Sequence, residues 1–390
     1  MTDLERILPL WRELETASAD YVLATVVAVE GSSYRKPGAC MLIAPDGRRA
    51  GTVSGGCLEA AVANRAWWLT ENGPTVQRYS TVEEDGDMPY GSGCGGVIFL
   101  LLERRPTANP LLAALEQAFL QRVAIAIATV LESPQIGRRA VAGLESDSIP
   151  EAKWIIQSAD APLQDLAQSA LALGESTEQH ISIDGSDVRV WTNFRSPRPC
   201  LWIFGAGDDT KPLLSLAKEL AWFVSVADGR SQLATRERFP LADDVTTLRI
   251  AELPGDRSAR SVTAFADMRT HDAAIILTHS FEQDARILAS LMKLDHPLAY
   301  IGVLGPKRRT RELLAEVVRL LDLPFESTIS SDLWIERSLA RLHAPMGLDL
   351  GAESAETIAF SILAEIQQCL TSATALPLRE VRNTIQTLSR

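Results

Sequence analysis

The apolar positions in the first part of the chain follow two periods, one helical and one alternating. Leu4 to Glu15 carries its apolar residues at helical spacing, which predicts an amphipathic helix packed on a core. Tyr21 to Val29 is a nearly unbroken apolar and β-branched run, which predicts a buried strand. Shorter strands, the first two joined by a turn at Pro45-Asp46-Gly47, are predicted at Ala39 to Ile43, Arg49 to Val53, Thr75 to Ser80 and Val97 to Leu102.

The following stretch has a weaker pattern. Two helices and one strand are predicted at Leu58 to Asn72, Pro110 to Gln121 and Val123 to Leu131. Residues 140–194 hold only short, ambiguous patterns and no candidate chemistry. Arg195-Ser196-Pro197-Arg198-Pro199 has the composition of a linker. We therefore predict two domains, residues 1–196 and residues 197–390.

The second half alternates strands and helices in the order of a parallel sheet. The strand Leu201 to Phe204 runs into Gly205-Ala206-Gly207, a helical pattern follows, and the next apolar run ends at Asp228. A strand, a glycine turn, a helix, a strand and a carboxylate about 20 residues on form the layout of a dinucleotide-binding βαβ unit. The predicted fold class is α/β, with an amino-terminal mixed α/β domain followed by a Rossmann-like, doubly wound parallel sheet.

Charge and cysteine usage narrow the class of protein. The net charge of -12 argues against general nucleic-acid binding and against an anionic membrane surface, so an anionic ligand would need local binding groups. No segment is apolar enough to span a bilayer, and the first residues lack the pattern of a signal peptide. The cysteines are odd in number and show no disulfide or zinc-finger spacing. We expect a cytoplasmic protein.

Two glycine-rich turns carry the candidate chemistry of the amino-terminal half. Ser54-Gly55-Gly56 follows a short strand, and adjacent glycines can aim successive backbone N–H groups at an anion. The helical pattern begins at Cys57, and the positive end of a helix dipole favours thiolate over thiol. Cys94 lies in a similar setting, Gly93-Cys94-Gly95-Gly96. Alternatively, each cysteine is only a small residue in a tight turn.

The loop Gly31 to Gly38 carries hydroxyl groups and two cations, including Ser33, Arg35 and Lys36. It is either a solvated loop or a second set of anion-binding groups. The second interpretation is favoured because the predicted hairpin after the loop folds the chain back, which would place this loop opposite the glycine turn before Cys57.

In the second half, Gly205 and Gly207 are predicted to define the fold, whereas phosphate binding by this turn is opposed by Asp208 and Asp209. Two unit charges about 4 Å apart near a surface repel by roughly 4 kcal/mol. His279 follows a predicted strand, at the sheet edge where such folds bind ligands, or it is a solvated loop histidine.

Two further turns are candidates. Gly305 precedes Lys307, Arg308 and Arg309, and cations in the first turn of a helix oppose its dipole, which favours an anionic ligand there over a merely solvated face. Gly347 implies a close backbone approach, either to a cofactor or to another element of the fold.

Taken together, these motifs resemble the XdhC/CoxI family, the accessory factors of xanthine dehydrogenase and carbon monoxide dehydrogenase. The amino-terminal resemblance lies in Gly31-Ser32-Ser33, Arg35-Lys36-Pro37-Gly38, Ser54-Gly55-Gly56-Cys57-Leu58-Glu59 and Gly93-Cys94-Gly95-Gly96. The second domain is similar in Gly205-Ala206-Gly207, Asp228 with Arg230, Thr278-His279, Tyr300 to Gly305 and His343 to Ala352.

The resemblance implies that the protein binds molybdenum cofactor (molybdopterin), assists its sulfuration by a cysteine desulfurase and hands it to a molybdenum hydroxylase apoenzyme. A homodimer is also implied. Cys57 and Cys94 become the candidates for metal contact or sulfur handling. The candidate cofactor-binding residues are Ser33, Arg35, Lys36, Ser54, Gly55, Gly56, Glu59, Gly93, Gly95, Gly205, Gly207, Asp228, Arg230, His279, Gly305, Lys307, Arg308, Arg309 and Gly347.

One departure from the family pattern matters, because Asp208 stands where the family usually has histidine after Gly-Ala-Gly. A cofactor chaperone is favoured over a turnover enzyme. The competing hypothesis is an NAD(P)-binding oxidoreductase with redox-active cysteines, although the aspartate pair disfavours NAD(P) at that turn. A third is an interaction protein whose Rossmann-like half only docks partners.

Overall fold

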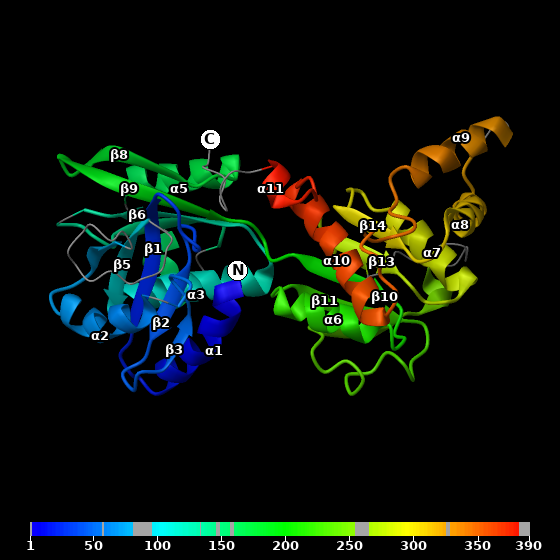
Figure 1. Ribbon diagram of the computed structural model, residues 1–390. Coiled ribbons are helices and arrows are strands. Elements are labelled where there is room, and N and C mark those ends of the chain that lie inside the picture. The colour runs from blue at the N-terminus through cyan, green and yellow to red at the C-terminus, as the bar shows by residue number, and fades with distance from the viewer. Residues whose placement is uncertain are drawn as a thin grey trace. The chain divides into compact units, whose positions relative to one another are not determined.

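The computed structural model describes residues 2–56, 58–80, 96–132, 134–145, 149–156, 160–253, 265–324 and 328–381 (Figure 1). The chain divides into two compact units, Met1–Arg198 together with Pro377–Arg390, and Pro199–Leu376. Among the helices of the described residues, none combines the length and the apolar character that crossing a membrane requires.

The first unit begins with a five-stranded antiparallel sheet in the order β3-β2-β1-β5-β4. Its strands are β1 (Val22–Glu30), β2 (Cys40–Ile43), β3 (Arg49–Gly51), β4 (Thr75–Ser80) and β5 (Val97–Arg104). Its helices are α1 (Thr2–Thr16), α2 (Glu59–Leu69) and α3 (Arg105–Gln121). These confirm the predicted helix and strands, although α3 begins five residues before the predicted start at Pro110, at Arg105.

Both faces of this sheet are buried, which explains the unbroken apolar run of β1. Leu23 packs into one cluster with residues of α1 and α3, whereas Val22 and Ala24 pack into another with residues of α2. Successive side chains of a strand point to opposite faces, so a strand covered on both sides needs apolar residues at every position.

A second antiparallel sheet, in the order β7-β6-β9-β8, combines β6, which confirms the strand predicted at Val123 to Leu131, with strands from the ambiguous segment. Its strands are β6 (Ile125–Val130), β7 (Arg139–Ala142), β8 (Thr177–Ile183) and β9 (Ser186–Arg195), with α4 (Lys153–Ile156), α5 (Ala161–Leu173) and the short 3₁₀ helix η2 (Pro150–Ala152). Strand β8 lies at the sheet edge and is mostly exposed, so it has no apolar alternation to detect. The turn Asp184-Gly185 was the available signal.

The predicted linker is partly wrong. β9 continues through Arg195, and Arg198 is buried with its guanidinium 4.2 Å from the centroid of the Phe119 ring. A buried ion pair of 2.6 Å between Arg139 on β7 and Glu103 on β5 joins the two sheets of this unit. The connection to the second unit is therefore shorter than the predicted linker Arg195 to Pro199. Arg198 belongs to the first unit, because an arginine can bury the apolar part of its side chain and stack on an aromatic ring.

The second unit is a five-stranded parallel sheet in the order β12-β11-β10-β13-β14. Its strands are β10 (Cys200–Phe204), β11 (Phe223–Asp228), β12 (Asp244–Thr247), β13 (Ala273–Ile276) and β14 (Tyr300–Val303). The remaining elements are α6 (Thr210–Glu219), α7 (Phe281–Met292), α8 (Lys307–Leu320), α9 (Thr328–Leu339), α10 (Ala355–Thr371) and η3 (Ile250–Glu252); the short α11 (Leu378–Val381) groups with the first unit.

Helices cover both faces of this sheet, which confirms the predicted fold class (Figure 1). Along β10, Leu201 and Ile203 pack with residues of α6 and α10, whereas Trp202 and Phe204 pack with residues of α7 and α8. The strand order reverses between β10 and β13, the point at which doubly wound sheets bind ligands.

Candidate functional site

Two segments of the first unit meet the loop of residues 31–38: the glycine turn and the end of the second glycine motif. The ring of Tyr34 lies against Gly55, where an added Cβ would stand 3.3 Å from Cδ2 of the ring. Arg35 Nε donates a hydrogen bond of 3.2 Å to the carbonyl oxygen of Thr52. At Gly96 an added Cβ would lie only 2.1 Å from the carbonyl oxygen of Ser32. The loop of residues 31–38 therefore faces the glycine turn and also contacts the end of the second glycine motif.

The amide groups before the glycine pair are occupied by the protein's own carboxylate. Glu59 Oε1 accepts hydrogen bonds from the backbone N–H groups of Val53, at 3.2 Å, and Ser54, at 2.8 Å. Ser54 Oγ donates to Glu59 Oε2 at 2.6 Å and accepts from the N–H groups of Gly56 and Leu58. The N–H groups that hold Glu59 are thus those of Val53 and Ser54, whereas the expected anion-binding N–H groups were those of the glycine pair; of that pair, Gly56 donates to Ser54 Oγ.

Helix α2 begins at Glu59, whereas the helical pattern predicted a start at Cys57. Burial alone would raise the pKa of Glu59, but the hydrogen bonds from Ser54 and Val53 outweigh it, so the pKa lies below its ordinary value. The carboxylate therefore stays charged at neutral pH and fixes the turn that precedes α2.

The predicted cations of the loop are not equally available. Arg35 forms an ion pair with Asp3 of α1, and Ser33 Oγ bonds to the backbone of Arg35 within the same turn. Lys36 is exposed, and no ion pair is found for it among the described residues. Lys36 is thus the cation of this loop that is best placed to meet an external anion.

Four predicted site residues lie outside the described residues: Cys57, Gly93, Cys94 and Gly95. Their roles remain predictions. Within the described residues, no group of three His, Cys, Asp or Glu side chains could hold a metal ion. In the part of the chain that the structure describes, no disulfide is formed by Cys40, Cys200 or Cys369; Cys40 and Cys200 are buried, and Cys369 is partly exposed.

In the second unit, other groups of the protein already pack against the glycine turn after β10. Gly205 has φ near 137°, and an added Cβ would stand 2.4 Å from the carbonyl oxygen of Leu277. An added Cβ at Gly207 would stand 2.5 Å from Asp209 Oδ1. Gly205 therefore defines the fold, as predicted, whereas the close approach that a pyrophosphate would make at Gly207 is made by an aspartate.

The carboxylate at the end of β11 is also engaged. Asp228 is fully buried, accepts 2.8 Å hydrogen bonds from the N–H groups of Ala206 and Arg230, and forms an ion pair with the Arg230 guanidinium at 2.7 Å. Burial would raise the pKa of Asp228, but these contacts lower it overall. In a dinucleotide site this carboxylate would bind a ribose hydroxyl, so the geometry disfavours NAD(P).

His279 lies at the carboxyl edge of the parallel sheet, as predicted, directly beyond β13 and Leu277-Thr278. Its Nε2 lies 3.1 Å from Asp209 Oδ2, and its backbone has a positive φ of 61°. Asp208 forms ion pairs with Lys211 and Arg238. Asp208 is thus balanced by two cations, whereas Asp209 contacts His279 through Oδ2 and its buried Oδ1 has no hydrogen-bond partner among the described residues.

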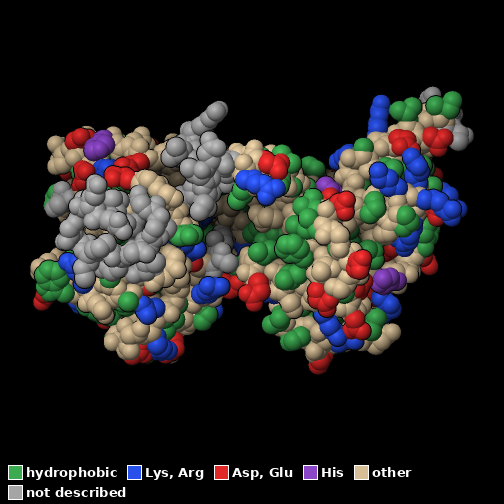
Figure 2. Space-filling view, in the orientation of Figure 1, with side chains coloured by type: hydrophobic (Ala, Val, Ile, Leu, Met, Phe, Trp, Pro, Cys, Tyr) green, Lys and Arg blue, Asp and Glu red, His purple; other side chains and the backbone are tan. Residues whose placement is uncertain are grey.

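Lysine and arginine side chains gather over α8 (Figure 2), but Arg309 has an internal role. Arg309 forms a 2.7 Å ion pair with the buried Asp284 and donates to the carbonyl oxygen of Leu304. Arg308 pairs with Glu312 at 3.2 Å on an exposed face. Gly305 has φ near 116° and packs beside Arg309. The conflict with the helix dipole is therefore relieved in part by Asp284.

Gly347 makes its close approach to another element of the fold. Its N–H donates a 2.6 Å hydrogen bond to Glu365 Oε2 on α10, and an added Cβ would stand 2.7 Å from Ser361 Oγ. Glu365 also accepts from Tyr300 Oη and contacts His343 Nδ1. Burial would raise the pKa of Glu365, but the bonds from His343, Tyr300 and Gly347 lower it overall. Sequence reasoning missed Glu365, which lies far along the chain from its partners.

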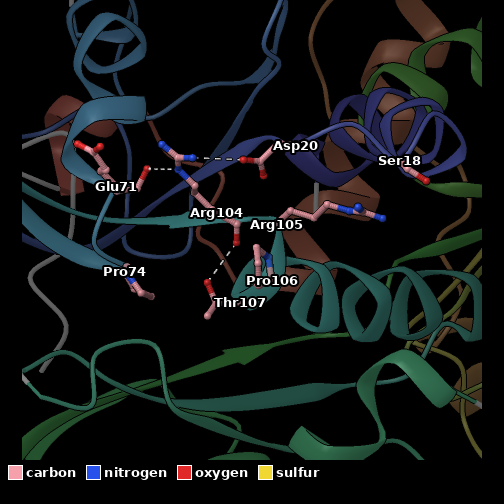
Figure 3. Close-up of a pocket in the computed structure, with 10 residues that line it drawn as sticks. Ser18, Asp20, Glu71, Pro74, Arg104, Arg105, Pro106 and Thr107 are labelled. Carbon is pink, nitrogen blue, oxygen red and sulfur yellow. Dashed lines mark hydrogen bonds and ion pairs between the residues drawn. The ribbon is translucent and has the colours of Figure 1, made fainter.

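A cavity of about 460 Å³ opens in the first unit near the start of α3 (Figure 3). Arg104 lies beside Asp20 there, donates to Thr70 Oγ1 at 3.1 Å and donates to the carbonyl oxygen of Trp67 at 2.6 Å. Arg105 points away from Arg104 and pairs with Glu15. The lining includes none of the predicted site residues, so this hollow and the predicted chemistry do not coincide.

Comparison with known proteins finds two family models along the chain. A model described as the XdhC and CoxI family matches residues 14–80, and one described as the XdhC Rossmann domain matches residues 201–366.

Three similar proteins span nearly the whole chain. A probable xanthine dehydrogenase subunit of Bacillus subtilis (strain 168) is 30% identical and aligns over 89% of this chain and 92% of its own length. The molybdenum cofactor insertion chaperone PaoD of Escherichia coli (strain K12) is 26% identical, over 88% of this chain and 82% of its own. A crystal structure described as a xanthine dehydrogenase from Bacillus halodurans has a TM-score of 0.65 at 29% identity, covering 98% of this chain and 100% of that one.

Proposed function

Because the chain belongs to the XdhC and CoxI family, we infer that it binds the molybdenum cofactor as cargo and delivers it to a molybdenum hydroxylase. The Escherichia coli relative is named as an insertion chaperone for this cofactor, and the Bacillus subtilis relative is named for xanthine dehydrogenase. In this proposal residues 1–196 carry the cargo site, and residues 197–390 form the Rossmann-like domain.

The observation that carries the proposal is that both glycine motifs contact the loop of residues 31–38. Tyr34 packs on Gly55, and Gly96 packs on the backbone of Ser32, so the described neighbours of Cys57 and of Cys94 approach the same loop. Thiolates of Cys57 and Cys94 would suit a soft metal centre. An exposed Lys36 and nearby backbone N–H groups suit the phosphate of a pterin.

The roles of the site residues follow from what each one already binds. Glu59 and Ser54 hold the turn in shape, and Asp3 holds Arg35, so these residues position the site. Cys57 and Cys94 are proposed to contact the metal. Lys36 is proposed to contact the phosphate. Few side chains remain to bind the cofactor, so binding should be weak. Weak binding suits a carrier, because a carrier must also release its cofactor.

The geometry of the second unit gives no support to the NAD(P)-dependent alternative. Asp228 is held by Arg230 and by the N–H of Ala206, and Asp209 stands against Gly207. A nucleotide would have to displace both carboxylates at a cost of several hydrogen bonds to charged groups, each worth about 1.5–3 kcal/mol.

The finer parts of the proposal are that the protein assists sulfuration of the cofactor by a cysteine desulfurase, acts as a homodimer and works in the cytoplasm. The support for sulfuration and for the homodimer is the family resemblance of the sequence motifs around Cys57, Cys94 and His343, and the support for the cytoplasm is the cysteine spacing.

The test is the cofactor content of protein expressed with the cofactor pathway intact. We expect wild-type protein to carry molybdenum and pterin in equal amounts, and the Cys57→Ser variant to lose most of both, because a hydroxyl is a poor ligand for a soft metal. Lys36→Gln should retain the fold and bind less pterin. Each protein is then added to hydroxylase apoenzyme, with and without cysteine desulfurase and cysteine, and hydroxylase activity is measured. The molecular mass of the purified protein itself is measured separately by light scattering.

The matched control is Cys40→Ala, which removes a buried thiol in the same unit. It should keep its molybdenum and pterin. Wild-type protein that carries neither molybdenum nor pterin and fails to activate the hydroxylase would refute the delivery role. Activation that is the same with and without the desulfurase would refute only the sulfuration role, and a monomeric mass would refute only the dimer.

A further inference from the structure

In the carboxyl-terminal half of the second unit, a cysteine contacts a histidine, and the same histidine contacts a glutamate. Cys369 Sγ lies 3.8 Å from His343 Nε2, and His343 Nδ1 lies 3.0 Å from Glu365 Oε1. Cys369 and Glu365 are on α10, and His343 is in the loop that pairs with β14 through Gly302 (Figure 1). A nucleophile, a base and a group that orients the base form the arrangement used for covalent catalysis by cysteine.

The hydrogen-bond pattern favours one tautomer of the neutral His343 ring. Glu365 has a lowered pKa and is ionised, so it accepts the Nδ1–H of the ring. In that tautomer Nε2 carries no proton, and it faces the Cys369 thiol. The ring is also stacked on Tyr300, with centroids 4.1 Å apart, so it is held in this orientation.

The thiol at rest keeps its proton. Burial and the nearby charge of Glu365 raise the pKa of Cys369 above its ordinary value. Attack by this sulfur therefore needs a base at the moment of reaction, and His343 Nε2 occupies that place. The thiol has one other close acceptor among the described residues, Gln368 Oε1 at 3.5 Å. Cys369 is only partly buried, and the His343 side chain is 29% exposed, so a small reagent can reach them.

We propose that Cys369 is a reactive thiol that attacks the sulfur–sulfur bond of a persulfide or a disulfide, with His343 as its base and Glu365 as the positioning residue. The Cys369 proton passes to His343 Nε2, and Sγ forms a bond to the outer sulfur. The original S–S bond breaks, and its electron pair leaves on the departing sulfur, which takes the proton from His343. The products are a Cys369 persulfide or mixed disulfide and one thiol, with no net oxidation. This activity is independent of cofactor delivery.

The test measures modification of Cys369 in the full-length protein at neutral pH. Tryptic cleavage after Arg341 and Arg379 yields residues 342–379, in which Cys369 is the one cysteine. Mass spectrometry of this peptide follows two separate reagents, inorganic polysulfide and glutathione disulfide. We expect the folded wild type to react faster than the same thiol in the urea-unfolded chain, and His343→Gln to react roughly tenfold or more slowly, as expected when a general base is lost.

Two variants separate catalysis from structure. Glu365→Gln should slow the reaction while leaving the peptide equally reactive in the unfolded chain. Gln367→Ala changes an exposed side chain on the same helix, outside the three contacting groups, so it should react at nearly the wild-type rate. Reaction with polysulfide alone identifies a persulfide donor, and reaction with glutathione disulfide alone identifies a disulfide. A folded wild type that reacts with neither reagent, or no faster than the unfolded chain, overturns the proposal.

Discussion

At the scale of single residues, charged groups of the candidate sites already bind other groups of the protein. Glu59 fills the amides of its own turn, Asp228 is held by Arg230, and Arg309 is held by Asp284. Each of these pairs is partly or fully buried, and a buried charge without a partner would cost several kcal/mol. Their first effect is therefore on the shape of the turns.

Glu59→Gln tests this view. The variant keeps the size of the side chain and removes its charge, so it should lower the free energy of unfolding by about 1–3 kcal/mol at pH 7. Because the folded pKa of Glu59 is lowered, its stabilisation is fully present above the ordinary glutamate pKa of 4.5 and is lost as the pH falls below it.

Urea unfolding of wild type and variant across this range should show the difference shrinking towards acid. The control is Glu71→Gln, an exposed carboxylate next to α2, which should change the free energy of unfolding by no more than about 0.5 kcal/mol. A constant difference at all pH values would contradict the proposed role of the charge.

At the scale of elements, the turn between β10 and α6 decides how the parallel sheet closes. Gly205 adopts a φ that side chains rarely tolerate, and its Cα approaches the backbone of Leu277 beyond β13. Thr210 Oγ1 donates to the Gly205 carbonyl oxygen at 2.8 Å and ties the start of α6 to the turn. The glycine at this position thus allows the turn after β10 to pack closely against the end of β13. This packing explains the glycine without a bound nucleotide.

Gly205→Ala should lower the free energy of unfolding by about 2–4 kcal/mol, because the methyl group would overlap a backbone oxygen in addition to straining φ. Gly185→Ala is the matched control. It also has a positive φ, near 79°, but an added Cβ meets no atom of the described residues within 4 Å. The control should cost about 1 kcal/mol, the strain alone. Equal costs in chemical denaturation would refute the packing argument.

At the scale of the whole molecule, each hydrophobic cluster of the described residues lies inside one unit. The two clusters that cover the faces of the parallel sheet run from Cys200 to Leu370. The clusters built around β1 and β6 lie within the first 200 residues. A unit with its own complete core has what it needs to fold alone.

Residues 199–376 should therefore fold as an isolated fragment, with a single cooperative transition in urea that coincides by circular dichroism and tryptophan fluorescence. A shorter fragment that starts at residue 210 lacks β10, the central strand, and should show no cooperative transition. A gradual, non-cooperative loss of signal in the longer fragment would show that its core is incomplete.

The sequence alone determined most strands of the parallel sheet, the strands of the first sheet and the family, but not the edge strand β12. These features are predicted from helical periods, alternating periods and glycine turns. Each of these patterns is local, because it depends only on residues that are close in the sequence. Strand β6 of the second sheet was predicted, but the polar edge strand β8 was not, because an exposed strand has no buried face to mark it.

Only the tertiary structure decided which charged groups are already occupied. Asp3 meets Arg35, Arg309 meets Asp284, and His343 meets Glu365 and Cys369 across long stretches of chain. The energy of a hydrogen bond or ion pair depends on the distance between its two atoms, and that distance exists only after the sheets and helices have packed.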